Sequence, residues 1–137
     1  MRIAVALLFI IHVFASSASA GEFVTGTAIN DAAKISDRDK QTFHLAVVPA
    51  GSHVGATAAL LTQKFLAAAK ARANLAVIGP DPNLTASAVV LALQIAADDS
   101  LIGATILYVG DTEYTEELQT AALPTGATVR TSQYSGK

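Results

Sequence analysis

The sequence predicts a small three-layer α/β domain, in which a parallel or mostly parallel sheet of about four to five strands lies between helices. Two observations support this class. From residue 42 onward, short apolar runs alternate with longer segments of helical periodicity. The hydrophobic fraction of 52%, against 15% charged residues, is enough for a packed core. Strands and helices that alternate in this way favour parallel strands joined by right-handed crossovers.

Four segments are the expected strands. Residues 43–48 form a continuous apolar run that stops at Pro49, as expected for a strand buried on both faces. Residues 75–78 end before a Gly-Pro-Asp-Pro turn, where proline cannot continue a hydrogen-bonded ladder. Residues 105–109 repeat the apolar signal. Residues 128–133 alternate with polar side chains, which suits an exposed edge strand.

Three helices are expected between these strands, at residues 56–73, 85–98 and 113–122. The first has an amphipathic stripe that should face the sheet. This stripe consists of Ala58, Leu61, Phe65 and Ala69. The third begins after Asp111 and Thr112, either of which can accept a hydrogen bond from an unpaired N–H at a helix start.

The expected topology is βαβαβαβ, Rossmann-like or flavodoxin-like, with the four strands in the order 2-1-3-4. Four strands are few for this architecture, so we expect an added N-terminal strand or a dimer to cover an open edge. In open α/β sheets, ligands bind beyond the carboxyl ends of the strands where the strand order reverses. The predicted order places that crevice between the loops that follow the first and third strands.

Residues 1–20 are typical of a secretory signal peptide. Arg2 supplies a positive start, residues 3–15 are apolar with one histidine, and residues 18–20 read Ala-Ser-Ala. The apolar run is shorter than the ~20 residues that span a bilayer core, which disfavours an uncleaved anchor. We therefore expect the mature chain to begin at Gly21, and the first 20 residues to contribute nothing to the core.

Removing 20 of the 137 residues leaves 117, a length that suits one domain. We place this domain at residues 42–137, after an N-terminal extension at 21–41 in which residues 23–29 are compatible with a short edge strand. Loss of Arg2 changes the formal net charge from −2 to −3. The remaining basic residues are dispersed, so the sequence does not favour nucleic-acid binding.

Cysteine is absent, so stability must come from packing even in a compartment that allows disulfides. The Ala-x-Ala ending and the abundance of alanine favour a bacterial protein that is periplasmic or secreted. We expect a soluble binding or interaction domain, with no membrane span after cleavage. Its expected partner is another envelope or extracellular protein, or a second copy of the chain.

The loop at residues 50–55 is the most site-like segment in the sequence. Its candidate ligand-binding residues, together with those that follow the second and third strands, are Gly51, Ser52, His53, Gly55, Asp81, Asp111 and Thr112. Glycine allows close approach of the backbone, and a following helix directs free N–H groups outward, so an anion or small polar ligand would suit the loop. The alternative is ordinary turn and capping chemistry, which needs the same residue types.

A small hydrolase is the second functional hypothesis, because Ser52, His53 and Asp81 or Asp111 all follow strand ends. The G-x-S-x-G nucleophile elbow is missing, however, and adjacent serine and histidine side chains point in different directions. The glycine-rich nucleotide-binding motifs are also missing. We therefore assign no catalytic residue.

Metal binding has little support in the sequence. Only His44 and His53 follow the predicted leader, and residues 37–39 resemble a calcium loop that lacks its later glycine and glutamate. We expect neither a metal nor a cofactor. Phe43 and Tyr108 are expected to be core residues.

Overall fold

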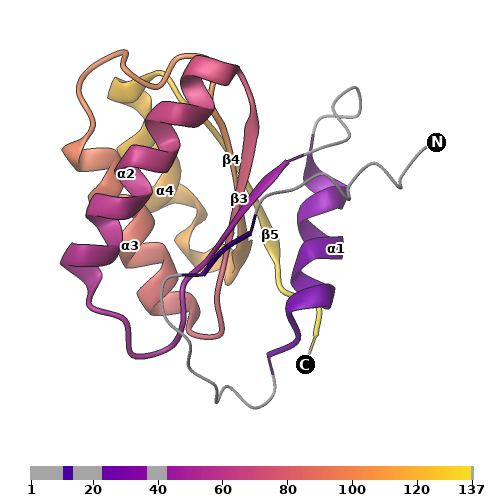
Figure 1. The fold of residues 1–137 in the computed structure, drawn as a ribbon. Coiled ribbons are helices and arrows are strands. Elements are labelled where there is room, and N and C mark those ends of the chain that lie inside the picture. Colours follow the sequence, from indigo (N-terminus) through magenta and orange to yellow (C-terminus); the bar gives the residue numbers. More distant parts are fainter. Residues whose placement is uncertain (1–10, 14–22, 37–42, 137) are drawn as a thin grey trace.

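The computed structural model describes residues 11–13, 23–36 and 43–136. They form a three-layer α/β fold, in which one helix covers one face of a parallel sheet and three helices cover the other (Figure 1). The described elements are, in chain order, β1 (Ile11–Val13), α1 (Thr25–Ile35), β2 (His44–Val47), α2 (Val54–Ala71), β3 (Asn74–Ile78), α3 (Pro82–Ile95), β4 (Thr105–Gly110), the 3-10 turn η2 (Thr112–Tyr114), α4 (Thr115–Ala122), the 3-10 turn η3 (Leu123–Thr125) and β5 (Thr128–Gln133). The predicted fold class is therefore confirmed.

The strand order differs from the predicted 2-1-3-4. The sheet runs β1-β2-β3-β4-β5, and every neighbouring pair is parallel. The strand order therefore does not reverse, and the crevice expected between the first and third predicted strands is absent because β3 lies between β2 and β4. Both orders alternate strands with helices along the chain, so the sequence pattern does not distinguish them.

Side chains alternate strictly between the two faces of the central strands. In β4, Ile106 and Tyr108 pack beneath α2, α3 and α4, whereas Leu107 and Val109 belong to the cluster beneath α1. All four are at most 1% exposed. The continuous apolar runs of the sequence are thus explained by strands buried on both faces.

Helix α1 replaces the edge strand expected at residues 23–29. Ala28, Asp31 and Ala32 are its buried residues, at the i, i+3, i+4 spacing of one helix face. They lie against the sheet on the side opposite to the other helices (Figure 1). An apolar stripe that covers a bare sheet face outweighs the weak β pattern of this segment.

The additional N-terminal strand is formed by Ile11–Val13, which pairs with β2 over three residues. The expectation that residues 1–20 lie apart from the domain is therefore wrong for this segment.

Each connection along the chain leads to the next strand of the sheet in the same direction, but α1 lies on the face opposite to α2, α3 and α4. The connection through α1 thus has the opposite hand to the other three, and about 98% of such crossovers share one hand.

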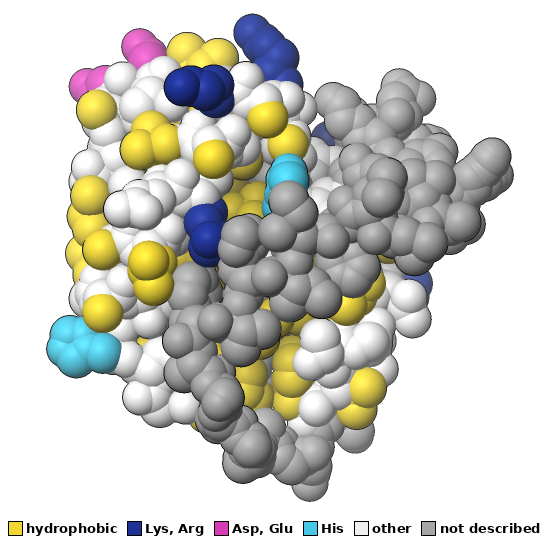
Figure 2. All heavy atoms as spheres, in the orientation of Figure 1, with side chains coloured by type: hydrophobic (Ala, Val, Ile, Leu, Met, Phe, Trp, Pro, Cys, Tyr) yellow, Lys and Arg dark blue, Asp and Glu magenta, His cyan; other side chains and the backbone are white. Residues whose placement is uncertain are grey.

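Within the described ranges, no helix is long and apolar enough to cross a membrane. On the face drawn in Figure 2, the Lys and Arg side chains do not gather into a continuous patch.

Candidate functional site

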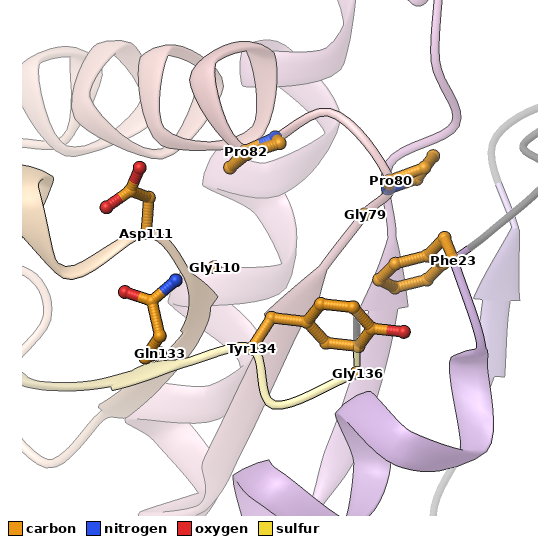
Figure 3. A pocket seen from close by; sticks show the side chains of 9 residues that line it. All are labelled: Phe23, Gly79, Pro80, Pro82, Gly110, Asp111, Gln133, Tyr134 and Gly136. Atoms are coloured by element: carbon orange, nitrogen blue, oxygen red, sulfur yellow. The ribbon is translucent and has the colours of Figure 1, made fainter.

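A cavity of about 310 Å³ lies at the carboxyl edge of the sheet, beyond the ends of β3, β4 and β5 (Figure 3). We call it the carboxyl-edge pocket, and its described lining residues are Phe23, Gly79, Pro80, Pro82, Gly110, Asp111, Gln133, Tyr134 and Gly136. They come from the start of the α1 segment, from three strand ends and from the tail that follows β5. Ligands of parallel α/β sheets bind at this edge, although the rule usually places them where the strand order reverses.

Gly79 allows the backbone at the end of β3 to pass close to its neighbours. A Cβ at this position would overlap the carbonyl oxygen of Val48 and lie 2.5 Å from Oγ1 of Thr85. After it, Asp81 caps α3 by accepting a hydrogen bond from the Leu84 N–H at 3.1 Å. Glycine is therefore required where β3 turns into α3 and forms one side of the pocket.

Tyr108 joins the start of α3 to the end of β4 near the pocket. Its buried phenol donates to the Pro82 carbonyl at 3.1 Å and accepts from the Asp111 N–H at 3.2 Å. Burial raises the pKa of Tyr108 to about 12, and the nearby carboxylates of Asp111 and Asp81 add to the rise. The phenol is therefore neutral near pH 7 and acts as a fixed hydrogen-bonding group.

The tail after β5 is held against α1 by residues that are far apart in the sequence. Asp31, only 2% exposed, accepts from the Ser135 N–H and from its hydroxyl, both at 2.8 Å. The Val24 N–H donates to the Tyr134 hydroxyl at 2.8 Å, and the rings of Phe23 and Tyr134 lie with their centroids 5.0 Å apart. We call these interactions the α1–tail contact, and they build the aromatic wall of the pocket (Figure 3).

Polar groups line the opposite wall. Asp111 accepts from the Glu113 N–H at 3.1 Å, which caps the turn η2 as the sequence predicts. Gln133 Oε1 accepts from both the N–H and the hydroxyl of Thr112, at 3.1 and 3.2 Å. The Thr112 N–H group can only donate, so the Gln133 atom that it contacts must be the amide oxygen. The NH₂ group of Gln133 therefore takes no part in this contact. Asp111 and Gln133 both line the pocket, and in Figure 3 they lie on the side away from Phe23.

The residues predicted in the loop after β2 serve the loop itself. Gly51 takes a positive φ of 82°, and the Ser52 hydroxyl donates to the Pro49 carbonyl at 2.7 Å. His53, an exposed residue, caps α2 by accepting the Ala56 N–H at Nδ1 over 3.3 Å. Gly55 packs near the His53 ring. None of these four predicted residues is among the described residues that line the carboxyl-edge pocket.

The structure brings together the other part of the predicted set. Asp111 lines the pocket, Thr112 bonds to Gln133 at its wall, and Asp81 caps the helix whose first residue lines it. Ser52 and His53 lie at the end of β2, two strand spacings or about 10 Å from the end of β4. The serine and histidine are engaged in turn and capping bonds, so the arrangement that a Ser-His-Asp triad needs is not formed.

Sequence reasoning missed the aromatic wall of the site. Phe23 was placed in an edge strand, and Tyr134 followed the last predicted element. One signal was present: Tyr-x-Gly occurs at the end of both β4 and β5. At Gly110 and Gly136 an added Cβ would overlap the hydroxyl of the tyrosine two residues earlier. This repeated pattern indicates rings that fold over the strand ends.

The described residues contain no group of three His, Cys, Asp or Glu side chains that could hold a metal ion. Residues 37–39, the partial calcium-loop pattern, lie outside the described ranges. His44 is half-buried in β2, and Phe43 and Tyr108 are core residues, as expected.

Comparison of the chain with protein-family models, with curated proteins and with solved structures found no match. The site must therefore be interpreted from its own geometry.

Proposed function

We propose that this chain is an exported α/β domain that binds a small ligand in the carboxyl-edge pocket. One observation carries the proposal: the cavity of about 310 Å³ has walls from the residue Phe23 just before α1, from three strand ends and from the tail after β5. This volume falls at the lower end of the range for small-molecule sites. Aromatic and proline walls with a few polar groups are also typical of such sites.

The hydrogen bonds around the pocket support a site that exists before the ligand arrives. Asp31 and Val24 hold the tail, and Tyr108 joins the start of α3 to the end of β4. A site whose walls are already ordered loses less conformational entropy on binding. The carboxyl-edge pocket has this property, whereas the exposed loop after β2 places its polar side chains in its own turn and cap.

A ligand screen by two-dimensional amide NMR tests the proposal. Small compounds that bind should shift the amide signals of Gly79, Gly110 and Tyr134 together. Phe23→Ala removes one aromatic wall and should weaken the binding of each such compound about tenfold, since a buried aromatic ring contributes roughly 1.4 kcal/mol or more. Leu66→Ala is the control, because Leu66 is an exposed apolar residue on α2. Shifts that cluster on the loop after β2 would contradict the proposal.

We also propose that the protein is exported, and the handedness of the strand-helix-strand connections supports this. Removal of residues 1–20 would take away β1, and with it the connection of opposite hand through α1. The remaining strands β2 to β5 would keep both of their helical layers. Intact-mass analysis of the exported protein should give a chain that begins at Gly21. A dominant species that retains Met1 would contradict cleavage.

A second candidate function is interaction with another envelope or extracellular protein, and exposed apolar side chains at the opposite end favour it. Ile102 and Leu123 are 56% and 77% exposed. Their loops are joined by bonds from the Asp99 and Leu101 N–H groups to the carbonyls of residues 124 and 125. Pull-down from an envelope fraction should recover a partner that Leu123→Ser loses. Recovery unchanged by this substitution would contradict a role for this surface.

A further inference from the structure

The charge of the carboxyl-edge pocket is the first guide to its ligand. Asp111 is the only side chain with a formal charge among the nine described lining residues. Asp81 lies at the start of the neighbouring helix and also acts electrostatically on Tyr108, so both carboxylates lie near the end of β4. A ligand in the pocket therefore meets negative charge.

Three backbone N–H groups at the strand-to-helix turns beside the pocket already donate to side chains of the chain itself. The Leu84 N–H donates to the Asp81 carboxylate, and the Glu113 N–H donates to Asp111. The Thr112 N–H donates to Gln133. Phosphate sites at strand-to-helix turns depend on such N–H groups being free. These three groups are therefore not available to an anion, which disfavours an anionic ligand in this pocket.

One side of the pocket offers aromatic faces. Phe23 and Tyr134 lie on the wall across from Asp111 in Figure 3, and both rings are partly buried. The Tyr134 hydroxyl accepts the Val24 N–H, which holds its ring in place. Faces of aromatic rings attract cations, most strongly when the cation is partly removed from water. A carboxylate and a pair of aromatic rings around one cavity are favourable contacts for a ligand that carries a cationic group on an apolar body.

We propose that the pocket binds a small organic cation, in which an ammonium or amidinium group is attached to an apolar or aromatic body. The cationic group pairs with the Asp111 carboxylate, whose Oδ1 already accepts from the Glu113 N–H. The apolar body packs on the rings of Phe23 and Tyr134 and on Pro80. This inference rests on the proposed function, because it names the ligand class of the same site.

Three probes of nearly equal size and different charge test this inference: benzylammonium, benzyl alcohol and benzoate. Their binding to the full chain is measured by titration calorimetry and amide NMR in phosphate buffer, which contains no competing amine. Benzylammonium should bind about tenfold more tightly than benzyl alcohol, the factor expected for a partly desolvated charged hydrogen bond. Benzoate should bind more weakly than benzyl alcohol.

The Asp111→Asn variant removes the charge of this side chain but keeps its capping hydrogen bond. The asparagine oxygen can still accept the Glu113 N–H, so the cap is kept while the charge is lost. This variant should lose the tenfold preference for benzylammonium and leave the affinity for benzyl alcohol within about twofold of its original value. Asp98→Asn is the matched control, since Asp98 is exposed between α3 and β4 at the other end of the sheet. It should retain the preference.

The outcomes distinguish the two proposals. If benzyl alcohol or benzoate binds in the pocket as tightly as benzylammonium, the pocket remains the site and the cationic ligand class is overturned. The same conclusion follows if Asp111→Asn keeps the preference. If benzylammonium shifts only signals outside the pocket, or no probe binds, the pocket is not the site and both proposals fall.

Discussion

The loop after β2 and the ends of β4 and β5 lie on the same edge of the sheet, yet of these two regions only the second is among the described residues that line the carboxyl-edge pocket. Ser52 and His53 bond to residues three positions away in the sequence. Asp31 and Ser135, in contrast, meet from 104 residues apart, and their contact places the tail beside α1. Glycine and polar side chains at a strand end are therefore not sufficient for a pocket, because a second segment of the chain must form the opposite wall.

The strongest test of the backbone between these two regions is Gly79→Ala. The new methyl group would overlap the Val48 carbonyl, which belongs to the neighbouring chain segment and cannot rotate away. We expect a loss of roughly 3 kcal/mol in the free energy of unfolding, measured by urea denaturation. Gly26→Ala is the control, because a Cβ there has open space in α1 and should stabilise the helix by about 0.5–1 kcal/mol. Equal stability of the two variants would contradict the close approach.

Tyr108→Phe removes the phenol that joins the start of α3 to the end of β4. The variant leaves the Pro82 carbonyl and the Asp111 N–H without this partner, so we expect a loss of about 2 kcal/mol at pH 7. Ring packing is retained. A loss below about 0.5 kcal/mol would show that the two hydrogen bonds are replaced by water.

The pH dependence gives an independent check on the same group. The pKa of Tyr108 is raised from 10.0 in an unfolded chain to about 12, so the folded state holds this proton more tightly. The associated stability is complete below pH 10 and is lost as the pH rises through 12, by roughly 2–3 kcal/mol. Urea denaturation between pH 9 and 12 should show a smaller fall for Tyr108→Phe than for the original chain, and parallel curves would contradict the shift.

Ser135→Ala should act on the α1–tail contact alone. It removes the hydroxyl that donates to the buried Asp31, with an expected cost of about 1–1.5 kcal/mol, while the Ser135 N–H continues to donate. Ser132→Ala is the matched control, since its hydroxyl makes a long bond of 3.4 Å and should cost less than about 0.5 kcal/mol. Chemical denaturation of the pair measures the difference, and equal values would contradict a stabilising bond from the Ser135 hydroxyl to Asp31.

His53→Ala should have the smallest effect. It removes the cap of α2, which costs about 0.5–1 kcal/mol at a solvent-exposed position. Thermal unfolding measures this loss. Because the loop after β2 does not line the pocket, the affinity for any ligand of the pocket should be unchanged. A ligand whose affinity falls severalfold in this variant would return the candidate site to the loop.

The sequence was sufficient for the layers of the fold, because buried strands and amphipathic helices leave local patterns. Residues 105–109 and 128–133 were recognised as strands, and Asp111 as a cap, from neighbours within a few positions. The strand order was not available from these patterns, since 2-1-3-4 and the observed order contain the same alternation. The order depends on which face each crossover takes, and that depends on long-range packing.

The site was predicted only in part, for the same physical reason. Asp111 could be found because it follows a buried strand, where side chains face the carboxyl edge. The pairing of Phe23 with Tyr134 could not, because it depends on a helix, α1, that covers the second face of the sheet, whereas the sequence predicts a strand there. Contacts between the two ends of a chain leave no spacing that a single sequence can reveal.

Amide hydrogen exchange at Val24 and Ser135 tests the central claim most directly. Their N–H groups donate to Tyr134 and to Asp31, and these two bonds hold the aromatic wall of the pocket. The account predicts that both amides exchange at least about a hundredfold more slowly than in an unstructured peptide, and that they lose protection together in Asp31→Ala. Exchange of either amide at the unstructured rate in the intact chain would contradict an ordered aromatic wall of the pocket at this edge of the sheet.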